Sequence, residues 1–119
     1  MAGNSFQIDY LEFPSREGGM KTRRFFEEAF GWAFVDYGPT YHGIEAAGID
    51  AGIQGEQSQA TAATLAVIRT QDLDAAQRAV ELAGGTVTRP QFDFPGGRRF
   101  HFREPGGNEM AVYVARSES

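Results

Sequence analysis

One pattern of strand, helix, glycine and strand occurs twice in this chain, and this duplication constrains the fold more than any other feature of the sequence. The first copy runs IDYLEF, KTRRFFEEAFGW and FVDYG, and the second runs LAVIRT, DLDAAQRAVELAGG and TVTRP. Ile8 aligns with Leu65 at an offset of 57 residues, whereas Gly31 aligns with Gly84 at an offset of 53. The repeat predicts two similar modules that pair their sheets around a shared concave surface.

Composition limits the classes of protein to consider. The length of 119 residues suits one compact domain, and a hydrophobic content of 41% with ten phenylalanines can supply its core. The absence of cysteine excludes disulfides, a thiol nucleophile and a thiolate metal site. No apolar run approaches the ~18 residues of a membrane span, and the first residues lack the pattern of a signal peptide. We therefore expect a cytoplasmic protein that does not bind a membrane.

The net charge of −5 argues against nucleic acid as a partner, because phosphate neutralisation needs a basic surface. The basic clusters are short and are typical of a solvated helix face or hairpin. An acidic surface would instead suit a cationic small molecule.

The expected elements follow the order β-α-β-β-β in each copy, which predicts an α+β fold with helices on one face of mixed sheets. In the first copy we expect a helix over about 20–30, ended by Gly31, and strands over 6–13, 32–37, 41–47 and 51–54. In the second copy Asp72 is a natural N-cap, and strands are expected over 65–70, 86–89, 99–103 and 110–115. The strand 86–89 should end at Pro90. Module one thus spans about 6–57 and module two about 64–115, with a polar linker over 55–63.

Four segments, in this order, resemble the vicinal oxygen chelate superfamily of glyoxalases, bleomycin-resistance proteins and extradiol dioxygenases: IDYLEFP, RRFFEEAFGW, DLDAAQRAVELAGGTV and RFHFREPGGNEMAVY. In the last segment Glu104 stands where the family usually has Asp. The resemblance covers nearly the whole chain. It implies two tandem βαβββ modules that form a cup-shaped mixed sheet with helices outside, usually in a homodimer. The cup is then built either within one chain or across two subunits.

The resemblance also places the family's four metal-ligand positions on this sequence. They fall on Ile8, on Leu65, on Ala111 and near Ile53 or Gln54, with Gln54 the better donor of the last two. Aliphatic side chains offer no lone pair to Zn²⁺, Mg²⁺ or Fe²⁺. We therefore expect no metal at the family site and no cofactor. The two histidines, His42 and His101, lie on different strands and are more typical of ordinary polar strand residues than of a relocated site.

Strand parity, counted from these positions, predicts which side chains face the cup. We take as ligand-binding candidates Tyr10, Glu12, Trp32, Val67, Arg69, His101 and Tyr113. Such a mixture of aromatic and polar groups suits a small organic ligand. Each also has a structural alternative: Glu12 and Arg69 as an ion pair, the tyrosines as packing residues, and Trp32 as part of the core. His101 is the candidate for proton chemistry because its ordinary pKa lies near neutrality.

The leading hypothesis is a member of this superfamily that lacks the family metal and binds a small organic ligand, in the manner of bleomycin-resistance proteins. Two enzymatic alternatives stay open. One is a metal-dependent lyase or dioxygenase, which the aliphatic ligand positions disfavour because its chemistry needs an electrophilic metal. The other is a metal-independent isomerase or lyase that uses His101, Glu12 or a tyrosine.

Overall fold

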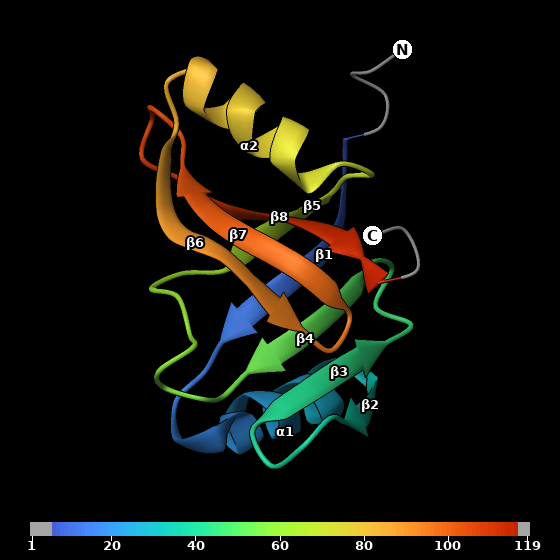
Figure 1. The fold of residues 1–119 in the computed structure, drawn as a ribbon. Coiled ribbons are helices and arrows are strands. Elements are labelled where there is room, and N and C mark those ends of the chain that lie inside the picture. The colour runs from blue at the N-terminus through green and yellow to red at the C-terminus, as the bar shows by residue number, and fades with distance from the viewer. Residues whose placement is uncertain (1–5, 117–119) are drawn as a thin grey trace. The chain divides into compact units, whose positions relative to one another are not determined.

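The computed structural model describes residues 6–116, and these form two compact units (Figure 1). Tyr10–Leu65 makes up the N-terminal unit, and the described residues on either side of it make up the C-terminal unit. The expected linker over 55–63 contains turns and no helix or strand. The boundary between the units follows it at Leu65, and a second boundary falls inside the first strand, after Asp9.

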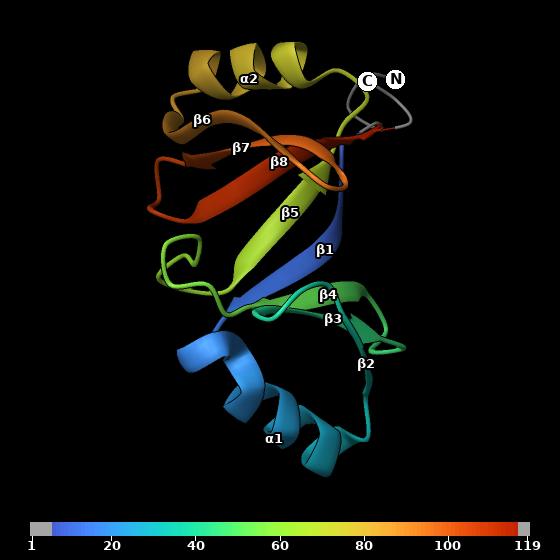
Figure 2. The same cartoon turned by 60° about the horizontal axis from the view of Figure 1, so that its bottom comes forward.

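The N-terminal unit contains four strands and one α-helix. Its elements are β1 (Gln7–Pro14), whose first residues belong to the other unit, the 3-10 turn η2 (Glu17–Gly19), α1 (Met20–Phe30), β2 (Ala33–Asp36), β3 (Tyr41–Glu45) and β4 (Asp50–Gln54). The strands lie in the order β2-β3-β4-β1. β1 is parallel to β4 and the other pairs are antiparallel, so the sheet is mixed. Figure 2 shows α1 along one face of it.

Alternation along the strands decides which side chains of this unit meet the helix. The core consists of Ile44, Ala51 and Ile53, with half-buried neighbours that include Leu11, Phe13, Phe26, Trp32 and Phe34. Leu11 and Phe13 are two apart in β1 and face α1, where the rings of Phe13 and Phe26 meet edge to face. Tyr10 and Glu12 therefore lie on the opposite face.

The C-terminal unit repeats the arrangement. It contains β5 (Leu65–Arg69), whose first residue belongs to the N-terminal unit, α2 (Leu73–Leu82), β6 (Thr86–Phe94), β7 (Gly97–Arg103) and β8 (Glu109–Ala115). The strands lie in the order β5-β8-β7-β6. β5 is parallel to β8, and the other pairs are antiparallel. Figure 2 shows α2 over β6, β7 and β8. Its core consists of Leu73, Ala76, Phe100, Phe102, Val112 and Val114. The predicted α+β fold of two βαβββ modules is confirmed, while the cup stays a prediction.

The end of α1 and the start of α2 are formed as the sequence predicts. α1 runs from Met20 to Phe30, and Gly31 then takes a left-handed conformation with φ 71° and donates its N–H to the Glu27 carbonyl. At the start of α2 the Asp72 carboxylate accepts the N–H of Ala75 at 3.0 Å. This contact satisfies one of the amides that a helix N-terminus leaves without a partner.

The expectation that a strand ends at Pro90 is wrong. β6 continues to Phe94, with irregular pairing to β7 between Val87 and Arg89 and again between Arg89 and Phe92. Proline lacks an N–H, but β6 is the last strand in its sheet, and an edge strand can turn such a residue away from the ladder. The extra length places Phe92 and Phe94 in the strand, where they pair with Arg99 and Gly97 of β7.

The loop after β7 is held by its own acidic residue. The Glu104 carboxylate accepts the backbone N–H of Gly106 and the backbone N–H and side-chain amide of Asn108. The bond from Gly106, followed by those from Asn108, lowers the pKa of Glu104. Glutamate therefore closes the loop at a position where the family usually has aspartate.

None of the helices formed by the described residues is long and apolar enough to cross a membrane.

We predict that Asp72→Ala lowers the free energy of unfolding by about 1 kcal/mol, because it removes the N-cap bond of α2. Urea denaturation at neutral pH measures this change. Gln71→Ala, at the exposed preceding residue, is the matched control and should leave stability unchanged. Equal values for the two variants would contradict a stabilising cap.

Candidate functional site

On the helix-free face of the N-terminal unit, two tyrosines and a buried carboxylate form a hydrogen-bonded chain. The hydroxyl groups of Tyr10 and Tyr41 are 2.6 Å apart, and the Tyr41 hydroxyl donates to Glu12 Oε2 at 2.9 Å. Glu12 is only 4% exposed. Burial, followed by the negative charge of Glu12, raises the pKa of Tyr41. Its phenol therefore stays protonated and remains a donor to the carboxylate.

Gly52 provides the room for this chain. It pairs with Glu12 across the parallel β1–β4 ladder. A Cβ atom at this position would collide with the hydroxyl groups of Tyr10 and Tyr41. Glycine here permits close approach of the two phenols to the backbone of β4.

On the helix-free face of the C-terminal unit, an arginine and a histidine are buried together. Arg99 is 9% exposed and His101 2% exposed. Arg99 donates to His101 Nε2 from Nε at 3.3 Å and lies 3.0 Å from it through Nη2. Because a guanidinium group can only donate, Nε2 accepts and the neutral ring carries its proton on Nδ1. That atom lies 3.8 Å from Glu109 Oε2.

The surroundings of His101 change its protonation. Burial, followed by the positive charges of Arg99 and Arg89, lowers its pKa to about 3. The ordinary pKa of a histidine, near neutrality, is what makes His101 a candidate for proton chemistry in the sequence. In the structure the ring is neutral at physiological pH and acts as an acceptor that orients Arg99.

Aromatic rings surround these cations. The Arg89 guanidinium lies 3.7 Å from the centre of the Phe92 ring. Arg99 lies 5.4 Å from the Phe92 ring and 5.5 Å from the Phe94 ring. These distances fall within the range of cation–π attraction. We call Arg89, Phe92, Phe94, Arg99 and His101 the arginine–aromatic cluster.

Beside this cluster, Tyr113 and Arg69 meet the first strand. The Tyr113 hydroxyl donates to Asp9 Oδ2 at 3.0 Å, and Arg69 Nη1 lies 3.9 Å from the same oxygen. The Arg69 guanidinium is 5.9 Å from the Tyr113 ring. Burial, followed by Asp9, raises the pKa of Tyr113. Asp9 thus ties the start of β1 to β5 and β8.

The structure separates the predicted ligand-binding residues into three groups. Tyr10 and Glu12 lie together in the N-terminal unit. Val67, Arg69, His101 and Tyr113 share the helix-free face of the C-terminal sheet, where Val67 pairs with Ala111 of β8. Trp32 lies with the helix-side core, its ring 5.1 Å from those of Phe26 and Phe30. Trp32 is therefore part of the core, the structural alternative to a ligand-binding role, and it does not lie with Tyr10 and Glu12 on the helix-free face.

The residues at the family's metal-ligand positions do not fit a metal ion. Leu65 and Ala111 are fully buried aliphatic side chains, and Ile8 is 53% exposed. Ile53 packs in the helix-side core, and Gln54 Oε1 accepts the N–H of Glu56 at 3.0 Å. Within residues 6–116, no group of three or more His, Cys, Asp or Glu side chains is placed to hold an ion.

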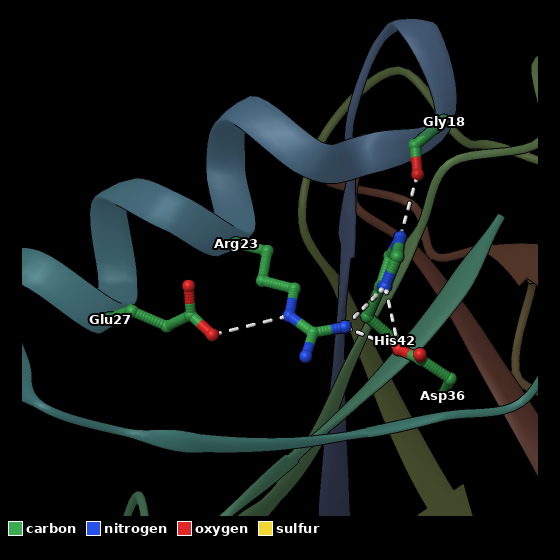
Figure 3. Close-up of polar contacts among 5 residues, drawn as sticks. All are labelled: Gly18, Arg23, Glu27, Asp36 and His42. Carbon is green, nitrogen blue, oxygen red and sulfur yellow. Dashed lines mark hydrogen bonds and ion pairs between the residues drawn. The ribbon is translucent and has the colours of Figure 1, made fainter. Parts of the chain in front are cut away.

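His42 has a structural role in the N-terminal unit, shown in Figure 3. Its Nε2 donates to the Gly18 carbonyl at 2.7 Å, and its Nδ1 lies 3.3 Å from Arg23 Nη1. Arg23 also pairs with Asp36 and Glu27. A side chain at Gly19 would meet the His42 ring, and φ there is 86°, so the turn before α1 needs glycine at this position. Nε2 thus fastens this turn to β3, and Nδ1 contacts α1 through Arg23.

Sequence reasoning missed Tyr41 and the aromatic part of the cluster. Tyr41 was placed on a strand, but only its pairing with Gln54 and the parity of its strand place it beside Tyr10. Phe92 and Phe94 were assigned to the segment after Pro90, where no strand was expected. An edge strand that tolerates proline is the signal that would have found them.

Comparison with known proteins agrees with this architecture. The profile of the Glyoxalase/Bleomycin resistance protein/Dioxygenase superfamily matches residues 19–112. The chain belongs to this superfamily. No curated protein matches the sequence.

Solved structures show the same fold at low identity. A hypothetical protein from Bacillus halodurans C-125 superposes with a TM-score of 0.75 at 8% identity, covering 97% of this chain and 98% of that one. Methylmalonyl-CoA epimerase from Mycobacterium tuberculosis gives 0.63 at 12% identity, with coverage of 90% and 86%. The Mn(II)-bound glyoxalase from Novosphingobium aromaticivorans gives 0.62 at 21% identity, covering 91% of this chain and 38% of that one.

We predict that Gly52→Ala lowers the free energy of unfolding by about 1–3 kcal/mol, since the added methyl group overpacks the tyrosine pair. Urea denaturation measures the cost in the wild-type background and in a Tyr41→Ala background. The cost should be smaller in the second, because one of the two colliding rings is gone. The same cost in both backgrounds would contradict the contact.

We predict that protonation of His101 contributes to acid destabilisation. Its folded pKa of about 3 lies below the ordinary 6.5, so the unfolded chain binds the extra proton between these values. Stability is then full above pH 6.5 and falls as the pH decreases towards 3, by up to about 1.4 kcal/mol per pH unit. In His101→Gln this part of the slope should disappear. Urea denaturation at several pH values from 4.5 to 7.5 tests it, and parallel slopes for the two proteins would refute it.

Proposed function

We propose that this chain binds a small organic molecule without a metal ion, through the arginine–aromatic cluster of the C-terminal unit. The observation that carries the proposal is the contact between Arg99 and a neutral His101 at 3.0 Å, on a sheet face that also holds the rings of Phe92 and Phe94. A buried cation whose direction is fixed by an acceptor is preorganised for recognition.

The chemistry of the cluster favours a planar ligand with an acidic group. Guanidinium groups match carboxylates in shape and charge. Aromatic rings supply apolar contact with little loss of conformational entropy. Arg69, Arg89, Arg99 and Arg103 bring four positive charges to or beside this face, against Asp9 and Glu109. The local charge thus favours an organic anion, in contrast to the cation that the net charge of −5 would suit.

A metal-dependent lyase or dioxygenase is the less favoured reading. Such chemistry needs several oxygen or nitrogen donors around one ion. The family positions supply three aliphatic side chains and one amide whose oxygen already accepts a backbone N–H. The manganese named for the Novosphingobium glyoxalase therefore gives no reason to expect manganese here.

A metal-independent isomerase or lyase is a second candidate, favoured by the chain from Tyr10 through Tyr41 to Glu12. A buried carboxylate next to a protonated phenol is a pair able to accept and return a proton. If this candidate holds, Glu12→Gln removes turnover of the bound compound, whereas a binding protein gives no turnover in either form.

The absence of a metal requirement is tested by elemental analysis of the native protein, combined with thermal-shift titration against Zn²⁺, Ni²⁺, Mn²⁺ and Fe²⁺. A metal ion that binds the folded protein must raise its melting temperature, so the titration detects binding. We expect no stoichiometric metal and no rise in the melting temperature. A stoichiometric ion that stabilises the protein would overturn the proposal and restore the glyoxalase and dioxygenase chemistries.

The ligand class is tested by calorimetry and thermal shift with aromatic carboxylates and their neutral amides. We expect carboxylates to bind better than the matched amides, and Arg99→Gln to weaken the binding by about tenfold or more, because it removes a charge-assisted contact. Arg78→Gln, on the exposed side of α2, is the control and should bind like wild type. Binding that is equal in Arg99→Gln and Arg78→Gln, or no binding of any carboxylate, would contradict the proposal.

A further inference from the structure

A groove lies between α2 and the strands that this helix covers in Figure 2. Its volume is about 340 Å³, within the range of small-molecule pockets. The helix contributes Ala76, Ala79 and Ala83 to its lining, and β7 and β8 contribute Phe102 and Val112. Every lining residue belongs to the C-terminal unit, so the groove is a feature of that unit alone.

The groove lies on the helix side of the sheet, away from the arginine–aromatic cluster. Phe102 and Val112 pack in the core with α2. Because side chains alternate along a strand, Arg99 and His101 of β7 lie on the other face. A molecule in the groove and a molecule at the cluster would therefore occupy opposite faces of the same sheet.

The groove has a buried floor and exposed edges. Its floor includes Ala76, Phe102 and Val112, all of which are buried. Phe6 and Ala83 are exposed at its edges. Water in contact with an apolar concave surface is unfavourable, so an apolar molecule of matching size gains free energy by replacing it.

The lining indicates a hydrocarbon ligand. Among the described residues that line the groove, Glu104 is the only one with a polar side chain. At about 30 Å³ for each non-hydrogen atom, the share of one water molecule in the liquid, the groove holds roughly ten such atoms. A straight chain such as an octyl group has this size, and burial of its methylene groups would supply most of the affinity.

Glu104 indicates the charge of the head group. Hydrogen bonds from Gly106, followed by those from Asn108, lower the pKa of this carboxyl group, so it is ionised at neutral pH. No lysine or arginine is among the described residues of the lining. An anionic head group would therefore be repelled at this edge of the groove, whereas an ammonium group would be attracted.

We propose that this groove binds an aliphatic amine, with its hydrocarbon chain between α2 and the sheet and its ammonium group beside Glu104. The net charge of −5 also favours a cation over an anion. The proposal does not depend on the proposed function, because the two sites lie on opposite faces of the sheet and favour ligands of opposite charge.

Titration with octylamine, 1-octanol and octanoate at neutral pH, followed by ¹H–¹⁵N NMR, tests the ligand class. The dissociation constants are read from the amide signals of α2, so octanoate bound at the arginine–aromatic cluster does not enter the comparison. We expect octylammonium to bind best, octanoate to bind about threefold more weakly or worse, and octanol to lie between them. Butylamine should bind at least about tenfold more weakly than octylamine, because its chain buries fewer methylene groups.

Filling the groove tests its location. Ala79→Phe places a ring in the groove and should weaken octylammonium binding about tenfold or more. Arg78→Phe adds the same ring at the exposed preceding residue, outside the lining, and should bind like wild type. Circular dichroism confirms that both variants are folded.

Glu104→Gln tests the contact with the head group. The preference for octylammonium over octanol should disappear in this variant, because the carboxylate charge is removed. Octanol is the internal reference, since any change in the loop itself alters the binding of both compounds alike.

Three results would overturn the proposal. The first is that octylammonium leaves the amide signals of α2 unchanged. The second is that octanoate or butylamine binds in the groove as tightly as octylammonium. The third is that Ala79→Phe binds octylammonium as well as Arg78→Phe does, which would place the amine elsewhere.

Discussion

The packing of one helix against one face of each sheet determines which strand side chains face the core and which face away from it. Successive strand residues point to opposite faces of a sheet. Because Phe100 and Phe102 pack in the core with α2, Arg99 and His101 lie on the opposite face of the sheet. In the N-terminal unit Leu11 and Phe13 face α1, and Tyr10 and Glu12 take the opposite face. The polar clusters are therefore a consequence of the two hydrophobic cores.

These polar groups are stable in place because each has a partner. Within the described part of the chain, no buried side-chain nitrogen or oxygen lacks a hydrogen bond. A buried carboxylate such as Glu12 would carry a large desolvation cost without the Tyr41 hydroxyl. The buried Arg99 guanidinium is stabilised by its hydrogen bond to His101 and by the aromatic rings. Burial, followed by the charge of Arg99, lowers the pKa of that histidine. The same burial that makes these groups strong recognition elements thus also decides which protonation state each can adopt.

Much of this arrangement could be predicted from the sequence, because helix periodicity, strand parity and the glycine and aspartate caps are local signals. They located α1, the cap at Asp72 and the shared face of Val67, Arg69, His101 and Tyr113. The features that could not be predicted depend on residues that are distant in the sequence. The strand through Pro90 is compatible with the edge position of β6, and Tyr41 joins Tyr10 through the register of β3 with β4. The low pKa of His101 comes from its burial, followed by the charges of Arg99 and Arg89. Trp32 shows the same limit, since parity alone did not separate the helix side from the free side for a residue between elements.

The division of β1 between the two units has a consequence for how the chain reaches its folded state. Tyr10–Leu65 is continuous in the sequence, so its contacts close comparatively short loops. The C-terminal unit must instead hold the first residues of β1, and the bond from Tyr113 to Asp9 spans 104 positions. Closing so long a loop costs entropy before any contact repays it. Residues of β1 thus complete the unit whose other strands follow much later in the chain, and the duplicated modules, although alike in pattern, close loops of different length.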